Sequence, residues 1–269
     1  MLSARWKVQL KNKMKIMQNI SGKFIGVLFF CVSYVCVLAQ DADIKAAETA
    51  YAAEQYDKAI ELYELVLRNY GDSYELYYNL GNSYYKDGKI ANAILNYERA
   101  LLIKPGDSDT RFNLEMAKQH TVEKIDPIDE FFLIKWFRSV QNMVGVDSWA
   151  TIGIVCFVLF VGCLVLFLFS KWMRLKKVGF YLGILLFITV VTANIFAYNQ
   201  KKDLIERKKA IVFAPTVTIK SSPDESGTDL FVLHEGTKVL IRNSVGNWNE
   251  IELEDGNIGW INKKDITVI

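Results

Sequence analysis

Residues 77–105 of the chain read YYNLGNSYYKDGKIANAILNYERALLIKP, and this stretch decides the fold of the N-terminal half. Its apolar residues recur every three or four positions, as on one face of a helix, and do not alternate as in a strand. Gly88 and Pro105 interrupt the pattern, because glycine and proline commonly end helices. The same spacing extends over residues 41–119, so the sequence predicts a region built of short helices.

This region has a repeat period of 34 residues, which is typical of stacked helical hairpins. Several buried-type positions recur one period later, namely Ala59, Tyr63 and Val66 as Ala93, Tyr97 and Ala100, and Leu80 as Leu114. The middle unit resembles the tetratricopeptide repeat at its diagnostic positions, which are Tyr77, Leu80, Gly81, Tyr84, Gly88, Ala93, Tyr97, Ala100 and Pro105. Small residues such as Gly81 and Ala93 allow two helices to approach closely, while large residues fill the seam between hairpins.

The resemblance implies a tetratricopeptide domain over residues 40–120, with two repeats and a capping helix. The first repeat, residues 40–73, matches less well, because Asp43 and Ala50 stand where large aromatic residues are expected. Residues 109–119 supply the capping helix, which covers the apolar face that a terminal repeat leaves open.

In this architecture the first helix of each hairpin lines a concave groove that can bind a protein segment. The repeat register assigns seven residues to the groove: Glu48, Tyr51, Tyr78, Asn82, Tyr85, Phe112 and Met116. For any single aromatic residue among them, packing in the seam is an equal alternative. A clamp for a C-terminal carboxylate is disfavoured, because Ile44, Glu48 and Asp109 stand where lysine and asparagine would be needed.

Composition argues against several functional classes. The chain has 269 residues, of which 51% are hydrophobic, and its net charge of +2 provides no concentrated basic face for nucleic acid. The four cysteines lie in apolar runs and there are only two histidines, so we predict no disulfide framework, metal site or cofactor. No phosphate-binding loop or catalytic nucleophile motif is present. The sequence therefore predicts no catalytic residues and a protein that is not an enzyme.

Residues 1–39 have the pattern of a signal peptide. Residues 1–40 contain six Lys or Arg and no acidic residue, and an apolar run over residues 24–38 precedes Ala39. We predict cleavage after Ala39, with an uncleaved membrane anchor as the alternative. A start at Met14 would give a leader of more ordinary length.

Two uncharged stretches, residues 149–169 and 178–198, follow the helical region. Each covers about 31 Å at 1.5 Å per residue, which matches the hydrocarbon thickness of a bilayer. They predict two transmembrane helices, and the basic loop between them, residues 170–177, favours the cytoplasm. Basic residues in the expected linker, 199–210, oppose this orientation, but the export signal decides for a two-pass inner-membrane protein with both flanking domains in the periplasm.

Two further features point to the membrane. Residues 121–148 carry several aromatic residues together with Lys135 and Arg138, which predicts an amphipathic interfacial segment, with packing on the repeats as the alternative. Gly179 and Gly183, one helical turn apart, allow another membrane helix to pack closely, although this signal is weak.

From residue 211 the pattern changes to short strands, which we expect at residues 217–219, 231–233, 238–241, 248–253 and 258–261. Turn residues separate the strands, and the segment resembles the bacterial SH3 domain through Val217, Ser222-Pro223, Gly236, Gly246-x-Trp248, Asp255-Gly256 and Gly259-Trp260-Ile261. The resemblance implies a small barrel over residues 211–269. We assign Trp248 and Trp260 to its core or rim, with a ligand-binding surface as the alternative.

The order of these parts resembles the BatE family of Bacteroides aerotolerance (Bat) operons. That resemblance implies membrane-anchored von Willebrand A-type Bat proteins and a MoxR-type ATPase as partners, and it supplies no catalytic residues. We therefore predict a multidomain α+β protein that serves as a membrane-anchored envelope scaffold or adaptor in a stress or aerotolerance complex. The alternative is a cell-wall-binding sensor whose SH3-like domain recognises peptidoglycan peptide.

Overall fold

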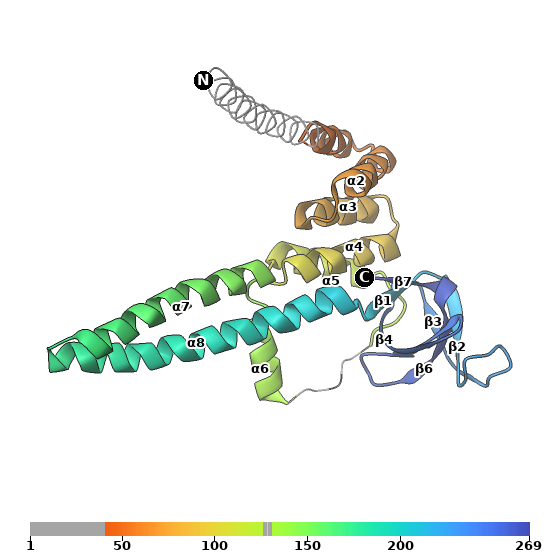
Figure 1. Cartoon of the computed structure of the whole chain (residues 1–269). Helices are drawn as coiled ribbons and strands as arrows, with labels where there is room; N and C mark the ends of the chain where they lie inside the picture. The colour runs from red at the N-terminus through yellow and green to blue at the C-terminus, as the bar shows by residue number, and fades with distance from the viewer. Residues whose placement is uncertain (1–40, 126–127, 129–130) are drawn as a thin grey trace, which may run out of the picture. The chain divides into compact units, whose positions relative to one another are not determined.

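A computed structural model describes residues 41–125, 128 and 131–269 (Figure 1). The chain divides into two compact units, with the boundary between Gly71 and Asp72, and each unit is described by itself. The expected signal peptide, residues 1–39, lies outside the described residues.

The first unit contains a helical hairpin. A helix over residues 41–52 is followed by α2 (Tyr56–Tyr70). The rings of Tyr51 and Tyr56 meet edge to face at 5.5 Å, and the Tyr70 hydroxyl donates to Asp43 Oδ2 at 3.1 Å. The residues at the periodic positions are buried, namely Ala59, Tyr63 and Val66. The two helices therefore have the form that the weaker first repeat predicts.

The second unit begins with the helices α3 (Tyr74–Lys86), α4 (Ile90–Ile103) and α5 (Ser108–Lys118), each packed on the next. The starts of α3 and α5 follow from N-cap side chains: Ser73 Oγ accepts from the Leu76 amide, and Asp107 Oδ1 accepts from the Thr110 amide. All of the large and small apolar residues at the periodic positions are buried, which confirms the 34-residue period: Leu80, Ala93, Tyr97, Ala100 and Leu114.

Gly81 shows why this repeat requires a small residue. A Cβ atom placed there would lie 2.7 Å from two ring carbons of Tyr97, closer than real Cβ atoms approach such neighbours. The Tyr97 side chain is 1% exposed and fills the seam between α3 and α4. The close helix approach predicted from the sequence is confirmed.

Three further helices follow: α6 (Phe132–Gln141), α7 (Val146–Phe169) and α8 (Met173–Glu206). The last two lie side by side as a long hairpin (Figure 1). Both are long and apolar enough to cross a membrane. The expected loop over residues 170–177 is shorter in the structure, because α8 already begins at Met173. Residues 199–210, expected as a linker, are helical as far as Glu206, so only two residues separate α8 from the first strand.

The C-terminal part forms one seven-stranded antiparallel sheet in the order β3-β2-β6-β5-β4-β1-β7. The strands are β1 (Lys209–Val212), β2 (Thr216–Lys220), β3 (Asp229–His234), β4 (Lys238–Val245), β5 (Trp248–Glu252), β6 (Ile258–Asn262) and β7 (Ile266–Val268), with a short 3-10 helix over Lys263–Asp265. The five expected strands are confirmed, and β1 and β7 were missed. The SH3-type barrel stays a prediction.

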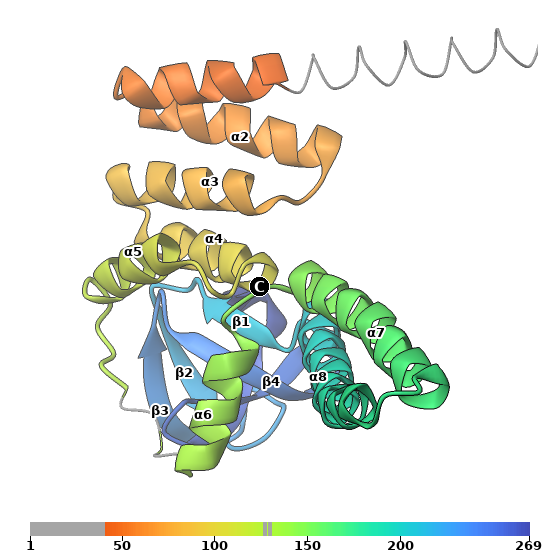
Figure 2. The same cartoon turned by 90° about the vertical axis from the view of Figure 1, so that its left-hand side faces the viewer.

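The sheet buries its own apolar core, and α4 packs directly against it. Alternate residues of the strands point inward, among them Ile219, Leu233, Ile251 and Ile261, all at most 2% exposed. Helix α4 contacts β1 and also the last turns of α8, and Figure 2 shows it lying over the sheet. The second repeat, the end of the apolar hairpin and the sheet thus belong to one compact unit rather than to separate modules.

Candidate functional site

The open face of α3 and α5 carries a small hydrogen-bonded cluster, the asparagine cluster, formed by Tyr78, Asn82, Tyr97 and Asn113. The Asn82 side-chain oxygen accepts from the Tyr97 hydroxyl at 2.8 Å and from Asn113 Nδ2 at 2.9 Å. Asn113 Nδ2 also lies 3.3 Å from the Tyr78 hydroxyl, to which it donates. These contacts join α3 to α5 through residues that include Tyr78 and Asn82, two of the residues that the sequence assigns to a groove.

The asparagine cluster leaves two amide groups available. Among the described residues, we find no hydrogen bond from Asn82 Nδ2 and none to Asn113 Oδ1. One is a donor and the other an acceptor, the pair that an extended peptide backbone requires. The phenyl ring of Phe112 lies one residue away and is 67% exposed. Helix α5 thus carries an exposed apolar ring next in sequence to Asn113.

Five of the seven predicted groove residues lie on α3 and α5 of the second unit, namely Tyr78, Asn82, Tyr85, Phe112 and Met116. Tyr85 pairs with His120, with 3.2 Å between its hydroxyl and the His120 Nε2 and 5.8 Å between the rings. Glu48 and Tyr51 belong to the first unit, where Glu48 is exposed and Tyr51 is half-buried. A single groove formed by all seven residues stays a prediction.

A charged junction, formed by Glu98, Lys118 and Lys238, links the repeat to the sheet. Lys238 Nζ lies 2.7 Å from both carboxylate oxygens of Glu98, which is 8% exposed, and Lys118 Nζ lies at 4.0 Å. Burial alone would raise the pKa of Glu98, but the positive charges of Lys238 and Lys118 outweigh it and the pKa is lowered. Burial likewise would lower the pKa of Lys238, but Glu98 raises it. Both groups are therefore charged at neutral pH.

A second polar contact fixes the turn between β3 and β4. Glu123 accepts hydrogen bonds from the His234 amide at 3.1 Å and from the Thr237 hydroxyl at 2.8 Å, and its Oε1 lies 2.7 Å from His234 Nδ1. Burial opposes ionisation of Glu123, yet the hydrogen bonds from His234 and Thr237 lower its pKa. Glu123 therefore has a structural role, because it holds the turn between β3 and β4 in place.

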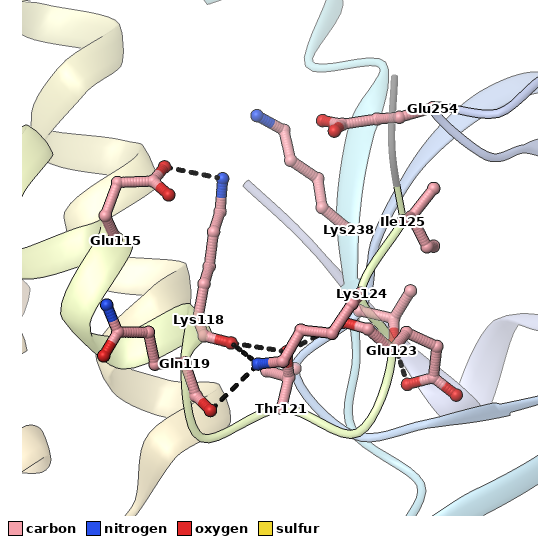
Figure 3. Close-up of a pocket in the computed structure, with 11 residues that line it drawn as sticks. Glu115, Lys118, Gln119, Thr121, Glu123, Lys124, Ile125, Lys238 and Glu254 are labelled. Carbon is pink, nitrogen blue, oxygen red and sulfur yellow. Dashed lines mark hydrogen bonds and ion pairs between the residues drawn. The ribbon is translucent and has the colours of Figure 1, made fainter. Parts of the chain in front are cut away.

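A cavity of about 490 Å³ lies between these two contacts (Figure 3). Lys238 and Glu254 face Glu115 and Lys118 across it, and Lys124 Nζ donates to the carbonyls of Lys118 and Gln119 at 3.1 and 2.9 Å. The ammonium groups of the lysines that line the cavity are thus already bonded to carbonyl or carboxylate groups of the protein. Within the described residues, no group of three or more His, Cys, Asp or Glu side chains is placed to hold a metal ion.

Trp248 and Trp260 lie on the outer face of the sheet. Register pairs Trp248 with Asn262 and Trp260 with Glu250, so the two indoles are diagonal neighbours on β5 and β6. Both are half-buried, whereas the inward positions Ile251 and Ile261 are fully buried. The pair therefore contributes to the surface of the sheet and not to its core.

Gly179 and Gly183 face the neighbouring helix of their own hairpin. A Cβ at Gly179 would lie 2.9 Å from the Cys163 carbonyl oxygen of α7, and one at Gly183 would lie 3.7 Å from the Cys163 Cβ. Both glycines are buried in the structure. The small residues that the sequence assigned to another membrane helix allow α7 and α8 to approach closely.

Sequence reasoning missed Asn113, Glu123 and the partner of Glu98. Asn113 follows Phe112 and lies at a position that the repeat register does not assign to the groove. Glu123 and Glu98 contact residues more than 100 positions away, so no local pattern marks them. The one available signal was the position of Glu98 on the buried face of a repeat helix, because a buried carboxylate requires a partner.

Comparison with known families matches the tetratricopeptide repeat to residues 74–107, which are α3, α4 and the turn after them. No curated protein matches the chain. Tetratricopeptide repeats generally mediate protein–protein interactions, and proteins that carry them are typically non-enzymatic scaffolds. The match and the fold therefore define residues 74–107 as a tetratricopeptide repeat, a class of repeat that generally binds proteins.

Proposed function

We propose that the chain is a membrane-anchored adaptor whose repeat groove binds an extended segment of a partner protein. The asparagine cluster is the observation that carries this proposal, because it presents an unpaired amide donor and an unpaired amide acceptor on α3 and α5, and the next residue along α5, Phe112, is exposed. Backbone hydrogen bonds then supply affinity and the apolar ring supplies side-chain selectivity.

The hairpin α7–α8 is the proposed anchor. Its apolar stretches remain largely exposed in the fold, unlike the core helices of a water-soluble protein. The contact of Glu98 on α4 with Lys238 on β4 supports a hairpin, because it requires the parts before and after the two spans to lie on the same side of the membrane. The basic residues of the short turn favour the cytoplasm for the opposite end. The repeat and the sheet then occupy the periplasm.

The resemblance to the BatE family supplies the partner class for this adaptor. We propose envelope proteins with von Willebrand A-type domains, acting with a MoxR-type ATPase in a stress or aerotolerance pathway, as the source of the bound segment. The bound segment of such a partner must be extended and accessible, and it must carry an apolar side chain that contacts Phe112.

The second candidate function is recognition of peptidoglycan peptide by the sheet. The observation that favours it is the half-buried pair Trp248 and Trp260 on one outer face. Aromatic side chains that are rigid and partly exposed are effective contact surfaces. In this case the repeats would relay occupancy of the sheet to membrane partners.

Capture from native membranes tests the two candidates together. The tagged full chain is compared with the double variant Phe112→Ala/Asn113→Ala, with Trp248→Ala/Trp260→Ala, and with Glu61→Ala on the exposed side of α2 as control. We expect the groove variant to lose about tenfold or more in partner recovery, which corresponds to about 1.4 kcal/mol or more, while the control is unchanged.

The outcomes separate the candidates. Equal recovery by the groove variant and the wild-type chain contradicts the adaptor proposal. Retention on purified cell wall that is lost in Trp248→Ala/Trp260→Ala, without a groove-dependent protein partner, supports the sensor instead.

A further inference from the structure

Helix α6 exposes an unusually large apolar surface. Its start and first two turns carry exposed aromatic and aliphatic side chains, which are Phe131, Phe132, Leu133, Ile134, Trp136 and Phe137, each between 40% and 67% exposed. A contiguous apolar surface of this kind is rare on a water-exposed helix and marks a face that another phase or molecule covers.

The charged residues of α6 lie on the opposite side of the helix. At 100° per residue, Lys135 and Arg138 lie about 60° apart, and Leu133 and Trp136 lie about 100° or more from both of them. Phe132 lies at the edge of the apolar face, about 60° from Lys135. Arg138 helps to line a cavity of about 560 Å³ together with sheet residues that include Leu240 and Glu252. The Arg138 side of α6 thus faces the sheet. Trp136 lies about 160° from Arg138 around the helix and is therefore turned away from the sheet.

The position of α6 along the hairpin decides how deep the helix would lie in a membrane. Helix α6 runs across the axis of α7 and α8 at the end of the hairpin that lies next to the sheet (Figures 1 and 2). Figure 1 shows the hairpin extending away from the sheet. A bilayer that surrounds the apolar hairpin would therefore end at α6.

Specific contacts hold α6 at this level. Gln200 Nε2 donates to the carbonyls of Gln141 and Val144 at 2.7 and 2.9 Å, and the Trp149 indole also donates to the Gln141 carbonyl at 2.8 Å. Gln200 is 5% exposed, so these bonds are shielded from water. They fix the end of α6 to the beginning of α7 and to α8.

Aromatic packing adds to these bonds. The Phe137 ring meets Phe196 of α8 edge to face at 4.7 Å, and Trp149 meets the same ring at 4.8 Å. Phe196 is close to the end of the uncharged stretch of α8, where the chain becomes polar. Aromatic residues concentrate at this depth of a membrane.

We propose that α6 is an in-plane membrane helix, with Phe132, Leu133 and Trp136 embedded among lipid at the boundary of headgroups and acyl chains. The inference rests on the proposed membrane-spanning hairpin and adds a third lipid contact that fixes the sheet against the membrane surface. Lys135 and Arg138 then lie at the level of the lipid phosphates, as in other interfacial amphipathic helices. Continuity with the apolar surface of the hairpin favours lipid over a second copy of the chain.

Spin-label accessibility tests the helix in the full chain, reconstituted in nanodiscs of phosphatidylcholine and phosphatidylglycerol. The native cysteines Cys31, Cys36, Cys156 and Cys163 are replaced by alanine, and single labels are placed by Leu133→Cys, Lys135→Cys and Val158→Cys. Oxygen partitions into lipid and a nickel chelate into water, so their collision rates separate the two environments. Lys135 is the matched control on the same helix, and Val158 reports the middle of α7.

We expect oxygen collisions to exceed nickel collisions at Leu133 and Val158, and the order to reverse at Lys135. If Val158 is lipid-exposed while Leu133 is nickel-accessible, the in-plane helix is wrong and the hairpin stands. If Val158 is nickel-accessible, the hairpin and this inference both fail. Protection of Leu133 from both reagents, with spin–spin broadening between labels, would instead assign the face to a second copy of the chain.

Discussion

Replacing Lys238 with methionine is expected to destabilise the second unit by about 3 kcal/mol or more, because it leaves a buried carboxylate without its partner. Glu98 is 8% exposed, and Lys238 Nζ contacts both of its oxygens at 2.7 Å. Lys118, at 4.0 Å, is too distant to replace both bonds. Hydrogen exchange of amides in α4 and β4, in the detergent-solubilised full chain, measures the free energy of local opening.

The pH dependence of this effect has a defined sign. Because the pKa of Glu98 is lowered in the fold, its contribution to stability is present above the unfolded carboxyl value of about 4.3 and is lost as pH falls through the folded value. Because the pKa of Lys238 is raised, its contribution is present below about 10.4 and is lost as pH rises beyond the folded value. In Lys238→Met, Glu98 stays buried without its partner, and burial opposes the charged form of Glu98. Lowering the pH should therefore stabilise the variant, whereas it destabilises the wild-type chain.

The matched control is the double variant Glu98→Met/Lys238→Met. Two apolar side chains of similar length in place of a buried ion pair often restore stability, so the double variant should be more stable than the single one. Native-like opening energies in α4 and β4 of Lys238→Met, with unchanged pH dependence, would show that the contact does not join the repeat to the sheet.

Replacing Gly81 with valine should destabilise the repeat by about 3 kcal/mol, near the upper end of the usual cost of overpacking. Even the first carbon of a side chain would lie 2.7 Å from the Tyr97 ring, and that ring is 1% exposed and bonded to Asn82. Hydrogen exchange in α3 and α4 reports the change. Capture of the partner should fall as well, because Asn82 belongs to the asparagine cluster.

A second substitution separates this steric effect from a general loss of stability. Tyr97→Leu removes the ring atoms that the new side chain would meet, so Gly81→Val/Tyr97→Leu should cost less than the two single substitutions together. Costs that simply add would show that Gly81 and Tyr97 do not compete for the same space.

Local patterns predicted the repeat and the middle strands well. Ala93, Tyr97 and Gly81 recur at fixed spacing because each repeat buries the same positions, and the alternation in β5 reflects one buried face. Strands β1 and β7 have only four and three residues, which is too short for alternation to identify them. Helix α8 extends past its apolar stretch to Glu206, and Gln200 in this extension bonds to the Gln141 carbonyl, 59 positions away, a contact that no local pattern indicates.

The candidate site was predictable in outline and not in its chemistry. The repeat register assigns Tyr78, Asn82 and Phe112 to one groove, because helices in a repeat have fixed orientations. The structure joins Tyr78 and Asn82 through Asn113, and the place of Phe112 in a groove stays a prediction. The sequence does not specify that Asn113 donates to Asn82, since this depends on the contact of α5 with α3. The junction of Glu98 with Lys238 depends likewise on residues 140 positions apart.

The most direct test of the adaptor is photo-crosslinking in intact cells from the groove itself. A photoreactive p-benzoylphenylalanine replaces Phe112, and the same residue at Glu61, exposed on α2, is the control. The account predicts a discrete protein adduct from position 112 that Asn82→Ala/Asn113→Ala removes and that position 61 does not give. The absence of a protein adduct at position 112, or an adduct formed equally at position 61 and in the asparagine variant, would contradict it.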